Sequence, residues 1–271
     1  MKILVANSGF PRAGTTLLQN ILAQNNLIHT ETASGLTNII HGSYIGYISD
    51  FDVPRNPNKS NLDKSLIKYC RGGIQTFLSD LTSKPIIIDK SRDWVKEYIL
   101  FKKIIPDFKV IFLVRDLRAI FSSFEKQYRK DIFKTYKWPV TEGDNRTLDL
   151  RYLNYLDLEM LNHPLKNLQN LIQCGYYKDI HFLRYEDLCS NPSNSLEKIY
   201  DYLNLDKYTH NFNKIDQVTK ELDNFITFGD HKIKNHIIPS TPDWEFILGT
   251  DISQDIYQKF EWFFQLFNYK K

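Results

Sequence analysis

The chain has 271 residues, 42% of them hydrophobic, which is enough for a sizeable core in one large α/β domain or two small ones. The 35 Lys and Arg residues nearly balance the 32 Asp and Glu residues, and the resulting net charge of +3 argues against a nucleic-acid-binding protein. A local basic site for a small polyanion is compatible with this balance.

Disulfide scaffolds, zinc sites and membrane proteins are also disfavoured. The three cysteines are sparse, odd in number and without CxxC spacing, so we expect neither a disulfide framework nor a metal site. The residues after Met1 already have the pattern of a strand, which leaves no room for a signal peptide, and no apolar stretch approaches the roughly 20 residues of a membrane span. We therefore expect a cytoplasmic protein without a membrane or nucleic-acid partner.

The elements predicted in chain order alternate between short apolar strands and helices. Strands are expected at 3–5, from 27–28, and at 86–88, 110–114 and 181–185, and helices from Thr15 and over 62–81, 93–105, 119–128, 148–174, 192–203 and 251–267. Residues 33–60, 129–146 and 206–250 are expected to be irregular, and the first two of these to shape a substrate pocket. The alternation predicts an α/β fold in three layers, α/β/α, with a central parallel sheet.

The loop between the first strand and the first helix has the features of a phosphate site. The first N–H groups of a helix lack internal partners and attract an anion, Gly14 permits close approach, and Thr15 and Thr16 add hydroxyls. Gly9, Gly14 and Thr16 match the P-loop pattern G-x-x-x-x-G-K-[ST], but Thr15 replaces its lysine. Because that lysine reaches the β- and γ-phosphates, its absence argues against transfer of a γ-phosphoryl group. Arg12 supplies a cation within the loop instead.

A second phosphate grip is suggested after the fourth predicted strand. Arg115 ends that strand and Ser123 lies two helical turns later, so a guanidinium fork and a hydroxyl are available. The alternative is that Arg115 pairs with Asp116 and that Ser123 is a surface residue. The polar clusters 12–16, 89–92 and 115–123 all follow predicted strands, and ligands of open α/β sheets bind at those carboxyl ends.

Together these segments resemble the sulfotransferases that use 3′-phosphoadenosine 5′-phosphosulfate (PAPS). The run Pro11–Thr16 is similar to that family's 5′-phosphosulfate loop, Arg115 with Ser123 to its 3′-phosphate site, and Arg184–Leu188 to its R-Y-E-D-L segment. The resemblance implies a single domain over residues 1–271 with the P-loop-like sulfotransferase fold. It implies nucleotide contacts from Arg12, Ala13, Gly14, Thr15, Thr16, Leu17, Arg115, Ser123 and Tyr185.

Two details of the resemblance concern the nucleotide. Ala13 stands where the family commonly has serine, which removes a hydroxyl but leaves the backbone N–H for binding. The late basic segment with Lys232 and Lys234 resembles the family's segment that closes over the nucleotide and reaches the 3′-phosphate; the alternative is a solvated basic loop.

The resemblance implies transfer of a sulfonate group from PAPS, as co-substrate, to a hydroxyl or amine, with release of adenosine 3′,5′-bisphosphate and no metal. The acceptor is open between a small molecule, a carbohydrate and a peptide, and the oligomeric state cannot be read. Two rivals stay open: a P-loop-type small-molecule kinase, with Asp89 as the magnesium-binding acid, and a non-catalytic nucleotide-binding protein of the same fold.

The general base is expected to be Glu31. The histidine that some sulfotransferases carry shortly after a strand-end lysine is absent from Lys90-Ser91-Arg92, whereas bacterial and protein-tyrosine types use a glutamate after the first helix, roughly where Glu31 lies. Lys90 and Arg12 are then expected to stabilise charge on the sulfonate and the leaving phosphate. The alternatives are a solvated loop acid for Glu31 and a surface lysine for Lys90.

Overall fold

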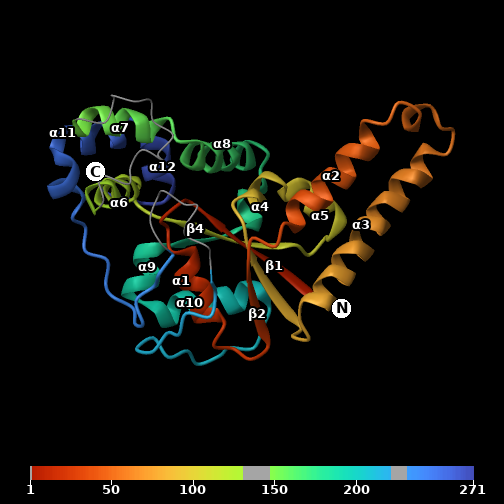
Figure 1. Cartoon of the computed structure of the whole chain (residues 1–271), viewed down its shortest axis with the longest axis horizontal. Coiled ribbons are helices and arrows are strands. Elements are labelled where there is room, and N and C mark those ends of the chain that lie inside the picture. The colour runs from red at the N-terminus through yellow and green to blue at the C-terminus, as the bar shows by residue number, and fades with distance from the viewer. Residues whose placement is uncertain (1, 131–146, 221–230) are drawn as a thin grey trace.

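Five apolar segments form one parallel sheet in the computed structural model, which describes residues 2–130, 147–220 and 231–271. Their order is β2-β3-β1-β4-β5 (Figure 1). The strands are β1 (Ile3–Gly9), β2 (Ile28–Thr32), β3 (Ile86–Lys90), β4 (Lys109–Val114) and β5 (His181–Arg184). Nearly every residue of β1, β3 and β4 is buried, as expected for strands covered on both faces. The predicted α/β fold with a central parallel sheet is confirmed.

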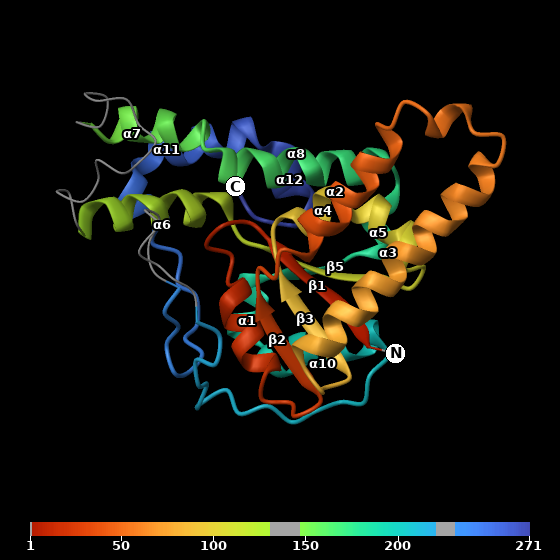
Figure 2. The same ribbon diagram turned by 45° about the vertical axis from the view of Figure 1, so that its right-hand side comes forward.

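Helices cover both faces of this sheet. Figures 1 and 2 show α1 and α10 on one face and α4, α5 and α8 on the other. The helices are α1 (Thr15–Leu22), α2 (Leu36–Ile48), α3 (Lys59–Leu81), α4 (Asp93–Lys96), α5 (Tyr98–Ile104), α6 (Leu117–Lys130), α7 (Leu148–Leu156), α8 (Glu159–Gln173), α9 (Tyr185–Ser190), α10 (Pro192–Leu203), α11 (Trp244–Lys259) and α12 (Glu261–Leu266), with 3₁₀ turns at Val53–Arg55 and Tyr176–Asp179.

The connections reverse direction between β1 and β4, which are neighbours. From β1 the chain passes through α1 to β2 at one edge, whereas from β4 it passes through α6, α7 and α8 to β5 at the other edge. Such a reversal opens a crevice at the carboxyl ends of the two strands, where ligands of this architecture bind. The loop 10–14 follows β1 and Arg115 follows β4, so the topology places both predicted phosphate grips at this point.

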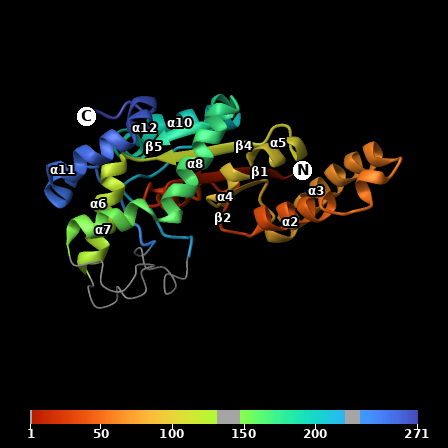
Figure 3. The same cartoon turned by 90° about the horizontal axis from the view of Figure 1, so that it is seen from above.

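The region 33–60, predicted to be irregular, contains helix α2 and a 3₁₀ turn. Helix α2 starts after Gly35, whose φ is 78°, and pairs with α3 in a hairpin that projects from the body (Figures 1, 2 and 3). Leu36 and Ile40 are buried and Tyr44 packs beside them, a spacing of four residues that marks one helical face. The turn-forming residues that suggested an irregular segment lie in the hairpin tip only.

Other boundaries also differ from the prediction. The expected helix 93–105 is divided into α4 and α5, and the helix 148–174 breaks at Asp157–Leu158, so Pro164 lies inside α8 rather than ending a helix. The last helical region begins at Trp244 and is interrupted at Gly249, whose φ of 78° is left-handed. The predicted pocket segment 129–146 lies almost wholly outside the described residues. None of the described helices has the length and apolar composition to cross a membrane.

Candidate active site

Helix α1 presents an uncapped N-terminus at the end of β1. Its preceding residue, Gly14, is left-handed with a φ of 90°, and no side chain caps the helix. The first N–H bonded within this element is that of Leu18, which donates to the Gly14 carbonyl at 3.0 Å. Asn7 of β1, fully buried, fixes the helix start by donating from Nδ2 to the Thr15 carbonyl at 3.0 Å. The geometry is that of an anion-binding helix end.

The loop itself is tightly folded around two residues that the sequence singled out. Arg12 has a φ of 61°, an uncommon conformation for a residue with a side chain, and strain of this kind clusters at ligand sites. Ala13 is fully buried, and its N–H donates to the Phe10 carbonyl at 3.2 Å. The backbone N–H that was expected to serve the ligand at Ala13 is therefore used inside the loop.

Lys90 lies beside the phosphate loop, as the sequence predicted. It is the last residue of β3, in register with Asn7 of the neighbouring β1. Its Nζ donates to the Thr16 hydroxyl in the first turn of α1 at 3.2 Å. One ammonium group therefore reaches the anion-binding end of the helix, where it supplies the cation that the loop lacks at Thr15.

The two predicted phosphate grips are in direct contact. Arg12 donates from Nε to the Ser123 hydroxyl on α6 at 3.1 Å, and Arg115 donates from Nη1 to the Arg12 carbonyl at 2.8 Å. Arg115 Nε is buried and has no hydrogen-bond partner among the described residues. Because buried donors are normally satisfied, an unpaired guanidinium N–H at this position suits an anionic ligand.

Tyr185 joins the loop to Arg115. The Arg115 guanidinium carbon lies 4.5 Å from the centre of its ring, and a Cβ added to Gly14 would lie 2.5 Å from its Cδ2. Burial raises the pKa of the Tyr185 phenol to about 12, so the side chain is neutral at physiological pH. Gly14 is therefore required here both for its backbone conformation and for the close approach of an aromatic ring.

A cavity of ≈ 270 Å³ adjoins Arg115 on the side of the C-terminal residues. Its lining is rich in cations and hydroxyls, and includes Arg115, Arg118, Arg184, Ser240, Thr241 and Trp244. The anion-binding character of the site thus extends beyond the predicted residues into the segment 240–244.

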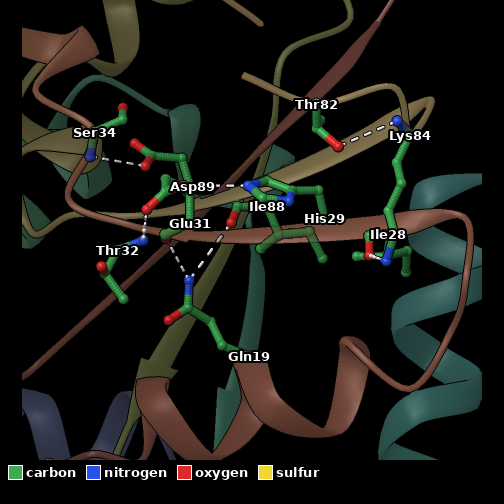
Figure 4. A network of polar contacts seen from close by, with 10 residues as sticks. All are labelled: Gln19, Ile28, His29, Glu31, Thr32, Ser34, Thr82, Lys84, Ile88 and Asp89. Atoms are coloured by element: carbon green, nitrogen blue, oxygen red, sulfur yellow. Dashed lines mark hydrogen bonds and ion pairs between the residues drawn. The ribbon is translucent and has the colours of Figure 1, made fainter. Parts of the chain in front are cut away.

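Glu31 lies one residue before the end of the edge strand β2, beside a second carboxylate (Figure 4). Its Oε2 is 3.2 Å from His29 Nε2, and its Oε1 accepts from the Thr32 N–H at 3.0 Å. Its Cα partner across the sheet is Asp89, which is 2% exposed and accepts from the Ser34 N–H at 3.1 Å. Glu31 keeps 29% of its side chain exposed, so an acceptor can reach Glu31 but not Asp89.

The structure does not bring Glu31 against Lys90. Thr32 is the residue in register with Lys90, and Glu31 is in register with Asp89. Because side chains alternate along a strand, Glu31 and Lys90 leave opposite faces of the sheet. They share only its carboxyl edge, where an acceptor would have to bridge them.

Lys232 and Lys234 are exposed in a segment without regular structure. This segment is tied to residue Gln217, which donates to the His231 carbonyl and accepts from the Ile233 N–H. In the part of the chain that the structure describes, neither lysine forms a hydrogen bond or ion pair with Arg115 or Ser123. Their role at the 3′-phosphate remains a prediction.

Comparison with known proteins identifies the family. A family model described as the sulfotransferase family matches residues 7–210, three quarters of the chain. The chain belongs to the sulfotransferase family. A search of curated protein sequences finds no significant match.

Solved structures agree with this sulfotransferase in fold. The sulfotransferase domain from the curacin biosynthetic pathway is 18% identical, with 96% of this chain and 97% of that chain covered and a TM-score of 0.57. The domain from the Synechococcus PCC 7002 olefin synthase is 19% identical, with 96% and 94% covered and a TM-score of 0.52. Mouse sulfotransferase SULT7A1 complexed with PAP is 14% identical, with 96% and 83% covered and a TM-score of 0.51. At these identities the likeness concerns the fold alone.

Two buried amides that position this sulfotransferase's site were not identified from the sequence. Gln19 of α1 donates to the carbonyl of Glu31 at 2.7 Å (Figure 4), and so fixes the end of β2 against the phosphate helix. Asn20 accepts from the N–H groups of Val218 and Thr219 and holds that segment to α1. Two amides within an otherwise apolar helical run were the available signal, because a buried amide needs specific partners.

Asp89 should make the stability of the protein depend on pH in the direction opposite to most carboxylates. Burial, with a smaller contribution from the Glu31 charge, raises the pKa of Asp89 to about 6. A raised pKa means that the folded state binds the proton more tightly, so this stabilisation is present below the unfolded pKa of 3.8 and is lost as pH rises through about 6. The free energy of unfolding of the parent relative to Asp89→Asn should therefore fall by about 2–3 kcal/mol between about pH 3.5 and about pH 7.

Urea unfolding of both proteins across this range measures the difference. The buried histidines His181 and His210 have a lowered pKa because of burial and oppose the trend, but they are common to both proteins and cancel. A difference that does not vary with pH would contradict the assignment.

Proposed function

We propose that this sulfotransferase transfers the sulfonate group of PAPS to a hydroxyl or amine of a small-molecule, carbohydrate or peptide acceptor. Adenosine 3′,5′-bisphosphate is the released product. The observation that carries the proposal is the contact between two phosphate grips at the strand reversal. Arg12 at the phosphate loop donates to Ser123, and Arg115 donates to the Arg12 carbonyl. A nucleotide with phosphates at both its 5′ and 3′ positions suits two adjoining cationic grips better than one with a single phosphate chain.

The residues support a metal-independent in-line displacement. The acceptor oxygen or nitrogen forms a bond to sulfur while the bond from sulfur to the bridging oxygen of the 5′-phosphate breaks. The acceptor proton passes to Glu31, the general base in this proposal, whose exposed carboxylate is fixed by the Thr32 N–H. Lys90 and Arg12 stabilise the charge that develops on the sulfonate and the bridging oxygen. In the described part of the chain, no group of three or more His, Cys, Asp or Glu is placed to hold a metal ion.

Incubation with PAPS labelled in its sulfonate group and a library of phenols, sugars and peptides tests the activity, with products identified by mass spectrometry. Labelled product formed in the presence of a chelator supports the proposal. Phosphoryl transfer from ATP that requires magnesium would favour the kinase instead.

Nucleotide selectivity tests the two grips separately from catalysis. Adenosine 3′,5′-bisphosphate should raise the melting temperature far more than AMP or ATP, since a ligand selective for the native state stabilises it. Arg115→Ala should weaken binding of the bisphosphate by roughly 10–100-fold and leave AMP binding unchanged, because a charge-assisted contact to one phosphate is lost. Arg71→Ala, on the distant helix α3, is the control. Equal shifts with AMP and the bisphosphate would remove the second grip.

A further inference from the structure

The last residues of the chain hold the backbone next to Arg115. Tyr269 is 8% exposed, and its phenol donates to Glu186 Oε2 at 2.8 Å. The other oxygen of the same carboxylate, Oε1, accepts from the N–H of Asp116 at 3.1 Å. Asp116 directly follows Arg115, so a single carboxylate bridges the C-terminal segment to the start of the second phosphate grip.

A second tie reaches the same place. Arg118 donates to the Asp116 carboxylate through Nε at 3.0 Å and Nη2 at 2.7 Å, and its Nη2 also donates to the Lys270 carbonyl at 2.7 Å. Both Asp116 and Arg118 are nearly buried. Two consecutive residues of the C-terminal segment thus bind the turn between β4 and α6, one through Glu186 and one through Arg118.

Tyr269 is itself firmly placed. Its ring is stacked on Phe263, with centroids 6.0 Å apart and an angle of 9° between planes, and the Arg184 guanidinium lies 4.3 Å from its centre. Burial raises the pKa of its phenol, so the hydroxyl keeps its proton and stays a donor to the Glu186 carboxylate. Glu186 in turn follows Tyr185, whose ring contacts the guanidinium of Arg115.

We propose that Tyr269 is a positioning residue for Arg115: through Glu186 it fixes the turn that carries Arg115, and so sets the selectivity for a nucleotide that bears a 3′-phosphate. This inference rests on the proposed function of Arg115. Tyr269 lies 154 positions after it in the chain (269 − 115) and touches no part of the nucleotide. Its effect must therefore appear in the grip on the 3′-phosphate and not in the grip on the 5′-phosphate.

The variant Tyr269→Phe keeps the ring stacking and removes the donor. Binding of adenosine 3′,5′-bisphosphate should weaken about 10-fold, whereas AMP binding should change less than about two-fold, since the loop 10–14 is untouched. Isothermal titration with both nucleotides gives the ratio of affinities, which a general loss of stability would not change. Glu186→Gln removes the charge that joins Tyr269 to Asp116 and should lower the same ratio, which provides a second variant if the first fails to fold.

Tyr152→Phe is the matched control. Its phenol donates to the Asp255 carboxylate at 2.6 Å between α7 and α11, so the same kind of bond is lost away from Arg115. This variant should keep the affinity ratio of the parent. A parent that prefers the bisphosphate, with an unchanged ratio in folded Tyr269→Phe and Glu186→Gln, would overturn the inference and leave the proposed function intact. A parent that binds AMP equally well would overturn both.

Discussion

The variant Glu31→Gln should transfer sulfonate roughly 10²–10⁴-fold more slowly than the parent, the usual scale for loss of a general base. Glutamine has the same size and can still accept from the Thr32 N–H, which now binds Glu31 Oε1 at 3.0 Å, but it cannot take the acceptor's proton. The affinity for adenosine 3′,5′-bisphosphate should be unchanged, because Glu31 lies on the opposite face of the sheet from Lys90 and the phosphate loop. Steady-state rates with PAPS and the acceptor found by screening, together with titration of the bisphosphate, measure both quantities.

His29 provides the control for this assignment. Its Nε2 is 3.2 Å from Glu31 Oε2 and its side chain is also partly exposed, so it is the other titratable group that an acceptor can reach. His29→Gln keeps a hydrogen-bonding partner for Glu31 and should reduce the rate far less than Glu31→Gln. A large loss in His29→Gln, with near-parental turnover in Glu31→Gln, would transfer the role of base to His29.

The convergence of the phosphate residues could be predicted because it follows from chain topology. Arg12, Lys90 and Arg115 each follow or end an apolar segment that could only be a buried strand, and the carboxyl ends of parallel strands share one edge. Local patterns were sufficient for these residues, since strand, loop and helix are read within a few positions. The contact between Arg12 and Ser123 is a direct consequence of that topology.

The direction of Glu31 could not be predicted in the same way. Whether Glu31 or Thr32 shares a face with Lys90 depends on the register of β2 against β3, and a shift of one residue exchanges the two faces. Nothing within the short strand Ile28–Thr32 fixes that register locally. It is set by the backbone of the edge strand and by Gln19, which donates to the carbonyls of Glu31 and Ile88.

The contribution of the C-terminal segment was missed for a different reason. Tyr269 lies in an aromatic-rich run that is typical of a core helix, and most of its neighbours, such as Phe263 and Phe264, are indeed core. A phenol that bonds a carboxylate 83 positions earlier leaves no periodic signal in the sequence. Long-range polar contacts of this kind are specified by the packing of the whole domain.

Gly14→Ala should abolish most nucleotide binding, with a loss in affinity for adenosine 3′,5′-bisphosphate of about 100-fold or more. The new methyl group would lie 2.5 Å from Cδ2 and 2.9 Å from Cε2 of Tyr185, a ring that is buried and in contact with the Arg115 guanidinium. Either the loop or the ring must move, and each carries one of the two phosphate grips. The φ of 90° adds backbone strain of about 1–2 kcal/mol for any residue with a Cβ.

Gly35→Ala separates these two effects of the Gly14 substitution. Gly35 has a φ of 78°, so alanine there is strained to a similar degree, but no atom lies within 4 Å of the added Cβ and the residue precedes α2, away from the phosphate loop. Both variants should lose a similar amount of stability in urea unfolding, while only Gly14→Ala loses affinity in titrations with the bisphosphate. If Gly14→Ala bound the bisphosphate as tightly as Gly35→Ala does, the close packing of Tyr185 on the phosphate loop would not matter for the nucleotide, and the proposed coupling of the two grips would be wrong.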